Sequence, residues 1–219
     1  MRQGKIRRLA IQPIVAMVVV IVGFFSSHLV LAEEFSADMT QQFGKMTMKG
    51  KFQMKDDNIR SDMEMMGQTR TTIVRKDKSL VWILIPKRQQ YMELPFSEET
   101  KNNPQFYQDK LESVATKQDL GSEEVNGYKC KKYLFTFNDQ SRGTMTQWFS
   151  EELQFPIKMV NKGSNWEMTT EFSNIKEGGV NDALFQIPQG YTKMEKPAGM
   201  PGMMPPASGK PVPAPTADK

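Results

Sequence analysis

Histidine and cysteine are almost absent from this sequence. Each occurs once, as His28 and Cys130. His28 lies in an apolar N-terminal segment, so residues 33–219 contain no imidazole that could act as a general base or bind a metal. The Ser-His-Asp and Cys-His arrangements of nucleophilic enzymes are therefore excluded there. A single cysteine also excludes a disulfide within the chain, so the fold has to be stabilised by its core.

Other chemical motifs are equally scarce. The run Asp56-Asp57-Asn58 lacks the spacing of a calcium-binding loop and is typical of a turn. Thioethers suit Cu(I), and copper handling is left as an alternative, although no histidine or second cysteine would assist. The methionines that could take part are Met63, Met65, Met66, Met200, Met203 and Met204. No paired-carboxylate motif supports a hydrolase. We therefore predict a non-enzymatic protein with no cofactor and no bound metal.

The N-terminus has the pattern of a secretory signal. Four basic residues within the first eight precede an apolar stretch, which is densest at 14–25 and ends at Ala32, a small residue suited to cleavage. This predicts a signal peptide over residues 1–32, a mature chain that begins at Glu33, and a periplasmic location. If the segment is not cleaved, it is nearly long enough to anchor the protein in a membrane.

Removal of that segment also removes the excess of positive charge. Four of the 29 Lys and Arg residues lie in it, which leaves 25 to balance the 25 Asp and Glu residues. Nucleic-acid binding therefore has no support from net charge, because such proteins carry a basic excess.

The remaining chain divides into one domain and a tail. Residues 33–195 have an ordinary length for a single core, and residues 196–219 are rich in Pro, Gly, Ala and Met without periodicity, which predicts a disordered tail. Within the domain, strand-like segments recur about every ten residues, with turn residues between them. The connections are too short for crossovers, so we expect a meander of antiparallel strands. This predicts a mainly β fold built on a large, curved antiparallel sheet.

Two segments indicate how the sheet is covered. Residues 45–55 alternate strictly, with methionines and Phe52 on one face and mostly lysines on the other. Residues 79–86, SLVWILIP, are apolar on both faces and are expected to form a strand that is covered on both sides. Cys130 shares the phase of Tyr128 and Leu134, so it is expected to pack inside, with an intermolecular disulfide as the alternative.

The strand pattern breaks at residues 97–116. Pro104 favours a helix that starts near it, and Tyr107, Leu111 and Val114 then share one face at helical spacing. We predict a short helix that acts as a lid, with Phe106, Tyr107, Leu111 and Val114 as its apolar residues. An ordinary packing helix is the alternative.

Methionine is unusually frequent on the apolar phases of neighbouring strands. Its flexible thioether side chain can repack around varied apolar ligands, although methionine also fills irregular cores. A single curved sheet with one apolar face needs something to cover it, and one short helix covers little. We therefore predict that this face binds a ligand through Met46, Met48, Phe52, Met54, Met63, Met65, Trp82, Leu84 and Met92.

Two longer motifs carry a resemblance to a known group of proteins. They are GSEEVNGYKCKKY at 121–133 and WFSEELQFPIKM at 148–159, preceded by the predicted signal peptide and the FSADM strand. Their order resembles that of the periplasmic lipoprotein-carrier superfamily of LolA and LolB, and more closely that of an uncharacterised bacterial family of the DUF4412 type. The resemblance covers residues 35–194.

The resemblance implies an incomplete half-barrel with a helical lid, whose concave face holds acyl chains. In these carriers an arginine near the early strands latches the lid, and Arg60 and Arg70 are the residues available for that role. The implied partner is a lipid or an acylated protein. An envelope protein that binds the same apolar face, as in a sensor or assembly module, is the alternative.

Overall fold

The structure is a computed structural model that describes residues 34–65, 67–96 and 111–194. The predicted signal peptide at 1–32, the predicted tail at 196–219 and the predicted lid residues Phe106 and Tyr107 lie outside the described residues. In the part of the chain that is described, no helix is long and apolar enough to cross a membrane.

The described residues form one 12-stranded sheet with very little helix. The strands are β1 (Glu34–Phe43), β2 (Met46–Lys55), β3 (Asn58–Met65), β4 (Gln68–Arg75), β5 (Leu80–Ile85), β6 (Gln90–Pro95), β7 (Ala115–Val125), β8 (Tyr128–Phe137), β9 (Thr144–Ser150), β10 (Phe155–Lys162), β11 (Glu167–Glu177) and β12 (Thr192–Lys193). The helical turns are η1 (Lys76–Lys78), η2 (Pro86–Arg88), α2 (Leu111–Val114), η3 (Gln140–Arg142) and η4 (Asp182–Phe185).

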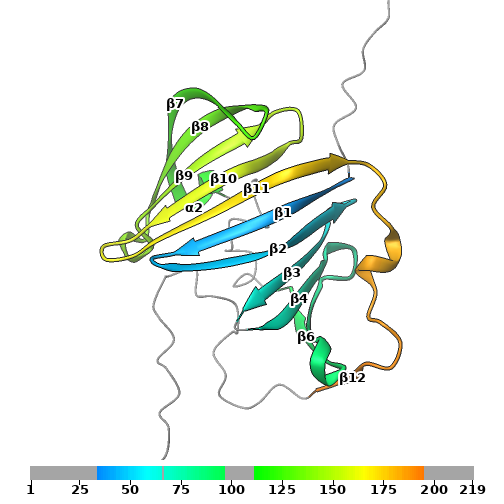
Figure 1. The fold of residues 1–219 in the computed structure, drawn as a ribbon. Coiled ribbons are helices and arrows are strands. Elements are labelled where there is room, and N and C mark those ends of the chain that lie inside the picture. Colours follow the sequence, from blue (N-terminus) through cyan, green and yellow to red (C-terminus); the bar gives the residue numbers. More distant parts are fainter. Residues whose placement is uncertain (1–33, 66, 97–110, 195–219) are drawn as a thin grey trace, which may run out of the picture.

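The sheet is built from two meanders that meet at β1. Across the sheet the order is β12-β6-β5-β4-β3-β2-β1-β11-β10-β9-β8-β7, so consecutive strands are neighbours within each half (Figure 1). Except for β12, which runs parallel to β6, every pair is antiparallel. The predicted antiparallel meander is therefore confirmed. Within each half, turns of a few residues connect consecutive strands, and such short turns permit only antiparallel pairing.

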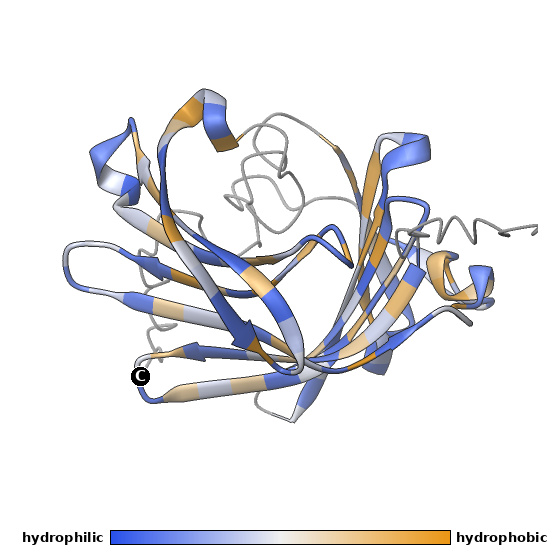
Figure 2. Cartoon of the chain, turned by 90° about the horizontal axis from the view of Figure 1, so that it is seen from above, coloured by the Kyte–Doolittle hydropathy of each residue, from blue (hydrophilic) through white to orange (hydrophobic). Residues whose placement is uncertain are grey.

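The sheet is strongly curved, and Figure 2 shows the two ends of the strand order turning toward each other. A glycine in the middle of β2 permits a close approach of β3. A Cβ atom added at Gly50 would lie 2.1 Å from the carbonyl oxygen of Asp62 and 2.6 Å from the sulfur of Met63. Register shifts in β1, β7 and β10 add local twist. The predicted curved, half-barrel-like sheet is therefore confirmed.

The main core lies on the inner, concave face of the sheet. It is one cluster that includes Ile83 and Met92 from one half and Phe135 from the other, so both halves contribute. At its centre four phenylalanines contact one another with ring centroids 4.9 to 5.6 Å apart: Phe35, Phe52, Phe155 and Phe172. Cys130 is fully buried in the same cluster, which confirms the prediction that it packs inside. Its phase was not the reason, because the core residues Phe135 and Phe137 of β8 alternate with it.

A second, smaller cluster lies on the outer face. Trp82 and Leu84 of β5 pack there with Val180 and Phe185, which belong to the segment after β11. We call residues 178–191 the C-terminal strap. On the opposite face of β5, Val81 and Ile83 belong to the main core. The prediction that this strand is covered on both sides is therefore confirmed, and the strap provides the outer cover.

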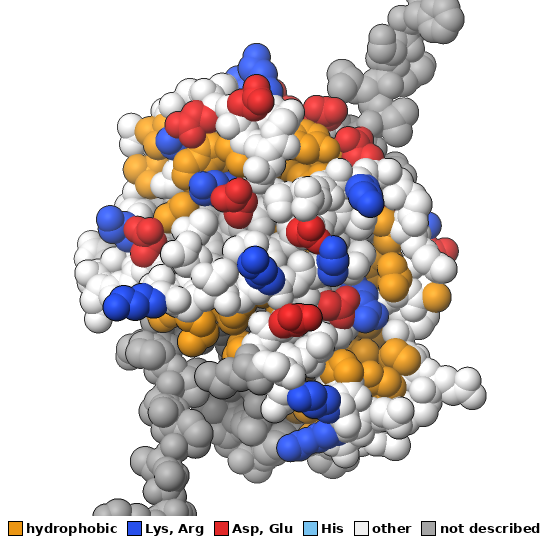
Figure 3. Space-filling model, viewed as in Figure 1, with side chains coloured by type: hydrophobic (Ala, Val, Ile, Leu, Met, Phe, Trp, Pro, Cys, Tyr) orange, Lys and Arg blue, Asp and Glu red, His pale blue; other side chains and the backbone are white. Residues whose placement is uncertain are grey.

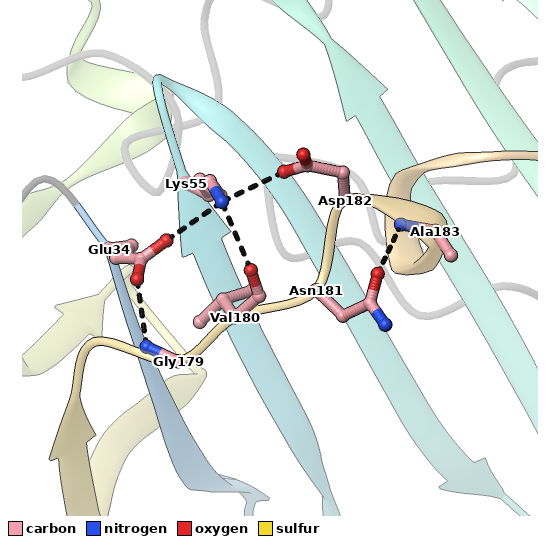
Figure 4. A network of polar contacts seen from close by, with 7 residues as sticks. All are labelled: Glu34, Lys55, Gly179, Val180, Asn181, Asp182 and Ala183. Atoms are coloured by element: carbon pink, nitrogen blue, oxygen red, sulfur yellow. Dashed lines mark hydrogen bonds and ion pairs between the residues drawn. The ribbon is translucent and has the colours of Figure 1, made fainter.

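Polar contacts tie the strap to the sheet (Figure 4). The ammonium group of Lys55 lies 3.1 Å from a carboxylate oxygen of Glu34, 2.9 Å from a carboxylate oxygen of Asp182 and 3.2 Å from the carbonyl oxygen of Val180. Glu34 also accepts a hydrogen bond of 2.7 Å from the backbone N–H of Gly179. The first described strand, β1, is thereby joined to the strap.

Two arginines hold the strap further along. Arg60 and Arg75 each donate one hydrogen bond of 2.9 Å, to the carbonyl oxygens of Leu184 and Phe185 respectively. Arg75 is buried, and its guanidinium also pairs with Asp77. These bonds satisfy carbonyl groups of a segment that covers an apolar surface, where an unpaired carbonyl would be costly.

The predicted break between the two halves is shorter than the sequence pattern indicated. It was expected to extend to Thr116, but α2 ends at Val114 and β7 begins at Ala115. Ala115 and Thr116 pair with Phe137 and Thr136 of β8. Pairing with an adjacent strand therefore overrides the weak local pattern of these two residues.

Candidate functional site on the inner face

The methionines of β2 and β3 gather at one end of the inner face. Met46 and Met48 open β2, whereas Met63 and Met65 close the antiparallel β3. Lys49 pairs with Glu64, so Met48 and Met65 are the next residues on the two neighbouring strands. We call this end of the sheet, defined by Met46, Met48, Met63 and Met65, the methionine end.

Burial decreases steeply toward the methionine end. Phe52 in the middle of β2 is 2 % exposed, whereas Met46 and Met65 are 48 % and 41 % exposed. In the middle, rings from β1, β10 and β11 cover Phe52. The inner face therefore has a closed aromatic core and, beside it, large apolar side chains that remain in contact with solvent.

The structure separates the nine predicted contact residues into three groups. Met46, Met48, Met63 and Met65 lie together at the methionine end, where Met63 also packs against the main core. Phe52, Met54 and Met92 belong to, or pack against, the buried core. Trp82 and Leu84 lie on the outer face, in the cluster beneath the strap.

The placement of Trp82 and Leu84 with the inner-face methionines was therefore wrong. Side chains alternate along a strand, and it is Val81 and Ile83 that face the main core. The Trp82 ring nitrogen instead donates a hydrogen bond of 3.0 Å to the Glu93 carboxylate. Because both phases of this strand are apolar, its sequence gives no signal that distinguishes the two faces.

Of the predicted lid residues, Leu111 and Val114 are described. Leu111 is buried in the main core and Val114 packs against it. These contacts agree with both expectations, a lid that closes on the inner face and an ordinary packing helix.

Two further residues at the methionine end were not predicted. Phe43 of β1 pairs with Met46 on one side and with Met168 of β11 on the other, and all three are at least partly exposed. Phe43 shares the phase of Phe35 and Met39 along β1, so the alternation in the sequence could have placed it on the inner face. Met168 could not be placed from the sequence, because the pairing of β1 with β11 joins segments far apart in the chain.

The two arginines considered for a lid latch lie on opposite faces. Arg60 pairs with Asp62 and holds the strap on the outer face. Arg70 pairs in register with Met63 and therefore projects on the inner face. Burial lowers the pKa of the Arg70 guanidinium, which nevertheless stays charged at neutral pH. The methionine end thus has a cationic neighbour.

The outer face has a different character. Figure 3 looks onto β1, β2 and β11 and shows acidic and basic side chains interspersed. They form ion pairs such as Lys51 with Asp38 and Lys158 with Glu171. This face carries charges of both signs, whereas the methionine end is apolar.

Reactive groups are few among the described residues. No group of three or more His, Cys, Asp or Glu side chains lies close enough together to hold a metal ion in the part of the chain that is described. Burial raises the pKa of the Cys130 thiol to about 11, so the thiol stays protonated at neutral pH and is a poor nucleophile.

The described residues thus define a mainly β class of protein, built on one open, curved antiparallel sheet with very little helix. The chain belongs to the family of the domain of unknown function DUF4412, whose model matches residues 35–154 and 138–191. This match confirms the resemblance to the DUF4412 family that the sequence indicated. No curated protein matches the chain.

Solved structures with a similar fold come from several bacteria. An uncharacterised conserved protein from Thermus thermophilus has a TM-score of 0.57 at 10 % identity, covering 76 % of this chain and 92 % of that chain. The lipoprotein LppX of Mycobacterium tuberculosis has a TM-score of 0.44 at 11 % identity, covering 67 % and 88 %. A LolA superfamily protein from Nitrosomonas europaea has a TM-score of 0.37 at 12 % identity, covering 71 % and 90 %. At these identities the likeness concerns the fold alone.

Proposed function

We propose that this protein is exported and binds the acyl chain of a lipid or lipoprotein on its inner face, at the methionine end. The observation that carries the proposal is the exposure of Met46 and Met65, which lie on the same face as the buried core. Large apolar side chains in contact with solvent beside a core are typical of a binding surface. The resemblance of the sequence to the LolA and LolB carriers supports the same function.

Burial of methylene groups would drive binding, at about 0.8 kcal/mol for each one removed from water. The methionine side chains have three rotatable bonds, so they can repack around chains of different shape. The closed cluster around Phe52 would limit how far a chain enters. No step of bond making or breaking is required, and we propose a carrier or binding protein and not an enzyme.

Export rests on the N-terminal pattern of basic residues, apolar stretch and Ala32. A periplasmic protein would meet acyl chains at the surfaces of the envelope membranes and on lipoproteins. If the N-terminal segment is retained, the same domain would work while attached to a membrane.

Native mass spectrometry of residues 33–219, purified from a bacterial periplasm without detergent, tests the proposal. We expect adducts with the masses of phospholipids or acylated compounds, and loss of these adducts in Met65→Glu. A matched control is Leu120→Glu, because Leu120 is 43 % exposed but lies on β7 at the far edge of the sheet. This variant should keep its adducts.

A bare mass with no uptake of added lipid would contradict the proposal, and so would equal loss of adducts in both variants. The same adaptable surface would also suit an apolar segment of an envelope protein. A lipid-free protein that forms a stable complex, disrupted by Met65→Glu but not by Leu120→Glu, would favour that alternative.

A further inference from the structure

A glutamine lies within the apolar inner face. Gln147 of β9 is paired in register with Tyr133 of β8 and Met159 of β10. Its side chain is 1 % exposed. Within the described residues, its amide nitrogen Nε2 has no hydrogen-bond partner.

Gln147 is part of a row that crosses the inner face. Successive strand pairs join Met48 to Gln41, Gln41 to Thr170, and Thr170 to Met159, which pairs with Gln147. The row therefore begins at the methionine end and runs along the inner face to Gln147. Gln41 donates a hydrogen bond of 3.4 Å to the Thr170 hydroxyl, so its amide has a partner.

Two other buried polar atoms have no partner among the described residues, the side-chain oxygens of Gln53 and Asn58. Gln53 pairs with Arg60, and Asn58 shares the phase of Arg60, so both lie on the outer face. Among the described residues, the amide nitrogen of Gln147 is therefore the only unpaired buried polar side-chain atom on the inner face, and it is a hydrogen-bond donor.

An unpaired buried donor is costly, and most buried polar groups in folded proteins are paired. Methionine or leucine would fill this position without that cost. A glutamine here is useful if a ligand brings an acceptor. The acceptor that accompanies an acyl chain is the carbonyl oxygen of its ester or amide bond.

We propose that the Gln147 amide donates a hydrogen bond to the acyl carbonyl of the bound ligand. The protein would then select acyl lipids, whose chain ends in a carbonyl, over alkyl lipids, whose chain ends in an ether oxygen. To reach Gln147, the ligand displaces neighbours in the row, of which Met159 is flexible and Tyr133 is half-buried. This inference rests on the proposed function and adds a feature of the ligand to it.

The test compares a monoacylglycerol, an N-acylethanolamine and an alkyl glycerol ether of the same chain length. Their dissociation constants for residues 33–219 are measured by calorimetry. We expect both carbonyl compounds to bind about three- to tenfold more tightly than the ether, the ratio that one net neutral hydrogen bond provides. A preference for only one of the two would identify the ester or the amide as the natural linkage.

Gln147→Met removes the donor and nearly preserves side-chain size. We expect it to bind all three compounds with the affinity of the ether and to unfold at an equal or higher urea concentration. Gln41→Met is the matched control, because it removes a paired amide from the same row. It should keep the preference for carbonyl compounds.

Two results would overturn the inference alone: equal binding of carbonyl compounds and ether by the natural protein, or a preference that survives in Gln147→Met. If none of the compounds binds, the proposed function fails as well. The two failures are therefore distinguishable.

Discussion

Replacement of Phe52 by alanine tests whether the middle of the inner face is a closed core or part of a binding surface. Phe52 is 2 % exposed, and its ring lies 5.6, 5.2 and 4.9 Å from the ring centroids of Phe35, Phe155 and Phe172. Removal of a buried phenylalanine ring costs about 3–5 kcal/mol, because apolar contacts are lost and a cavity remains.

Several aromatic contacts are lost at once, and each adds about 0.5–1.5 kcal/mol beyond the buried area. We therefore expect a loss near the upper end, about 4–5 kcal/mol in the free energy of unfolding. For a domain of this size, this corresponds to a fall of about 8–20 °C in the melting temperature.

Urea unfolding followed by circular dichroism measures this loss. The midpoint should fall while the dependence of the free energy on urea stays constant, because the native fold is kept. Met46→Ala is the control, since Met46 is 48 % exposed and its loss should change stability by no more than about 0.5 kcal/mol. A loss below about 1 kcal/mol in Phe52→Ala would refute the closed core and return Phe52 to the candidate ligand contacts.

Three further predictions concern acid stability, thiol reactivity and strand spacing. The hydrogen bond from Lys55 holds the pKa of Glu34 below its usual 4.5, so the unfolded chain binds more protons than the folded chain near that pH. The free energy of unfolding should therefore fall as the pH drops below about 4.5. Glu34→Gln should flatten part of this pH dependence, which is measured as urea midpoints from neutral to acidic pH. Cys130 should react with a thiol reagent only as the protein unfolds, so rapid labelling of the native protein would contradict its burial. Gly50→Ala should cost about 1–3 kcal/mol in urea unfolding, because its Cβ would collide with the backbone of β3, and an unchanged midpoint would show that the strands can separate freely there.

The strands could be predicted closely from the sequence, because alternation is a local property. Residues 45–55 were expected to form one half-buried strand, and β2 covers Met46–Lys55. Residues 79–86 were expected to form a strand covered on both sides, and β5 covers Leu80–Ile85. In both segments the period of two, bounded by turn residues, contains the necessary information.

The arrangement of the proposed binding surface could be predicted only in part. Alternation correctly placed Met46, Met48 and Phe52 on one face of β2, but it contains nothing about depth along that face. Phe52 is covered because Phe155 and Phe172 come from the other half of the sheet. Met46 is exposed because no described residue covers it to the same extent.

By itself, the sequence determined the class of the fold, the period of each strand and the absence of histidine chemistry from residues 33–219. These follow from residue types and near neighbours, which local sterics and short turns convert directly into strands. Only the tertiary structure decided which face of β5 is the inner one, that the strap covers the other face, and that Gln147 lies in line with the methionine end. Those features depend on the pairing of β1 with β11 and on the curvature of the sheet, which bring together residues more than a hundred positions apart.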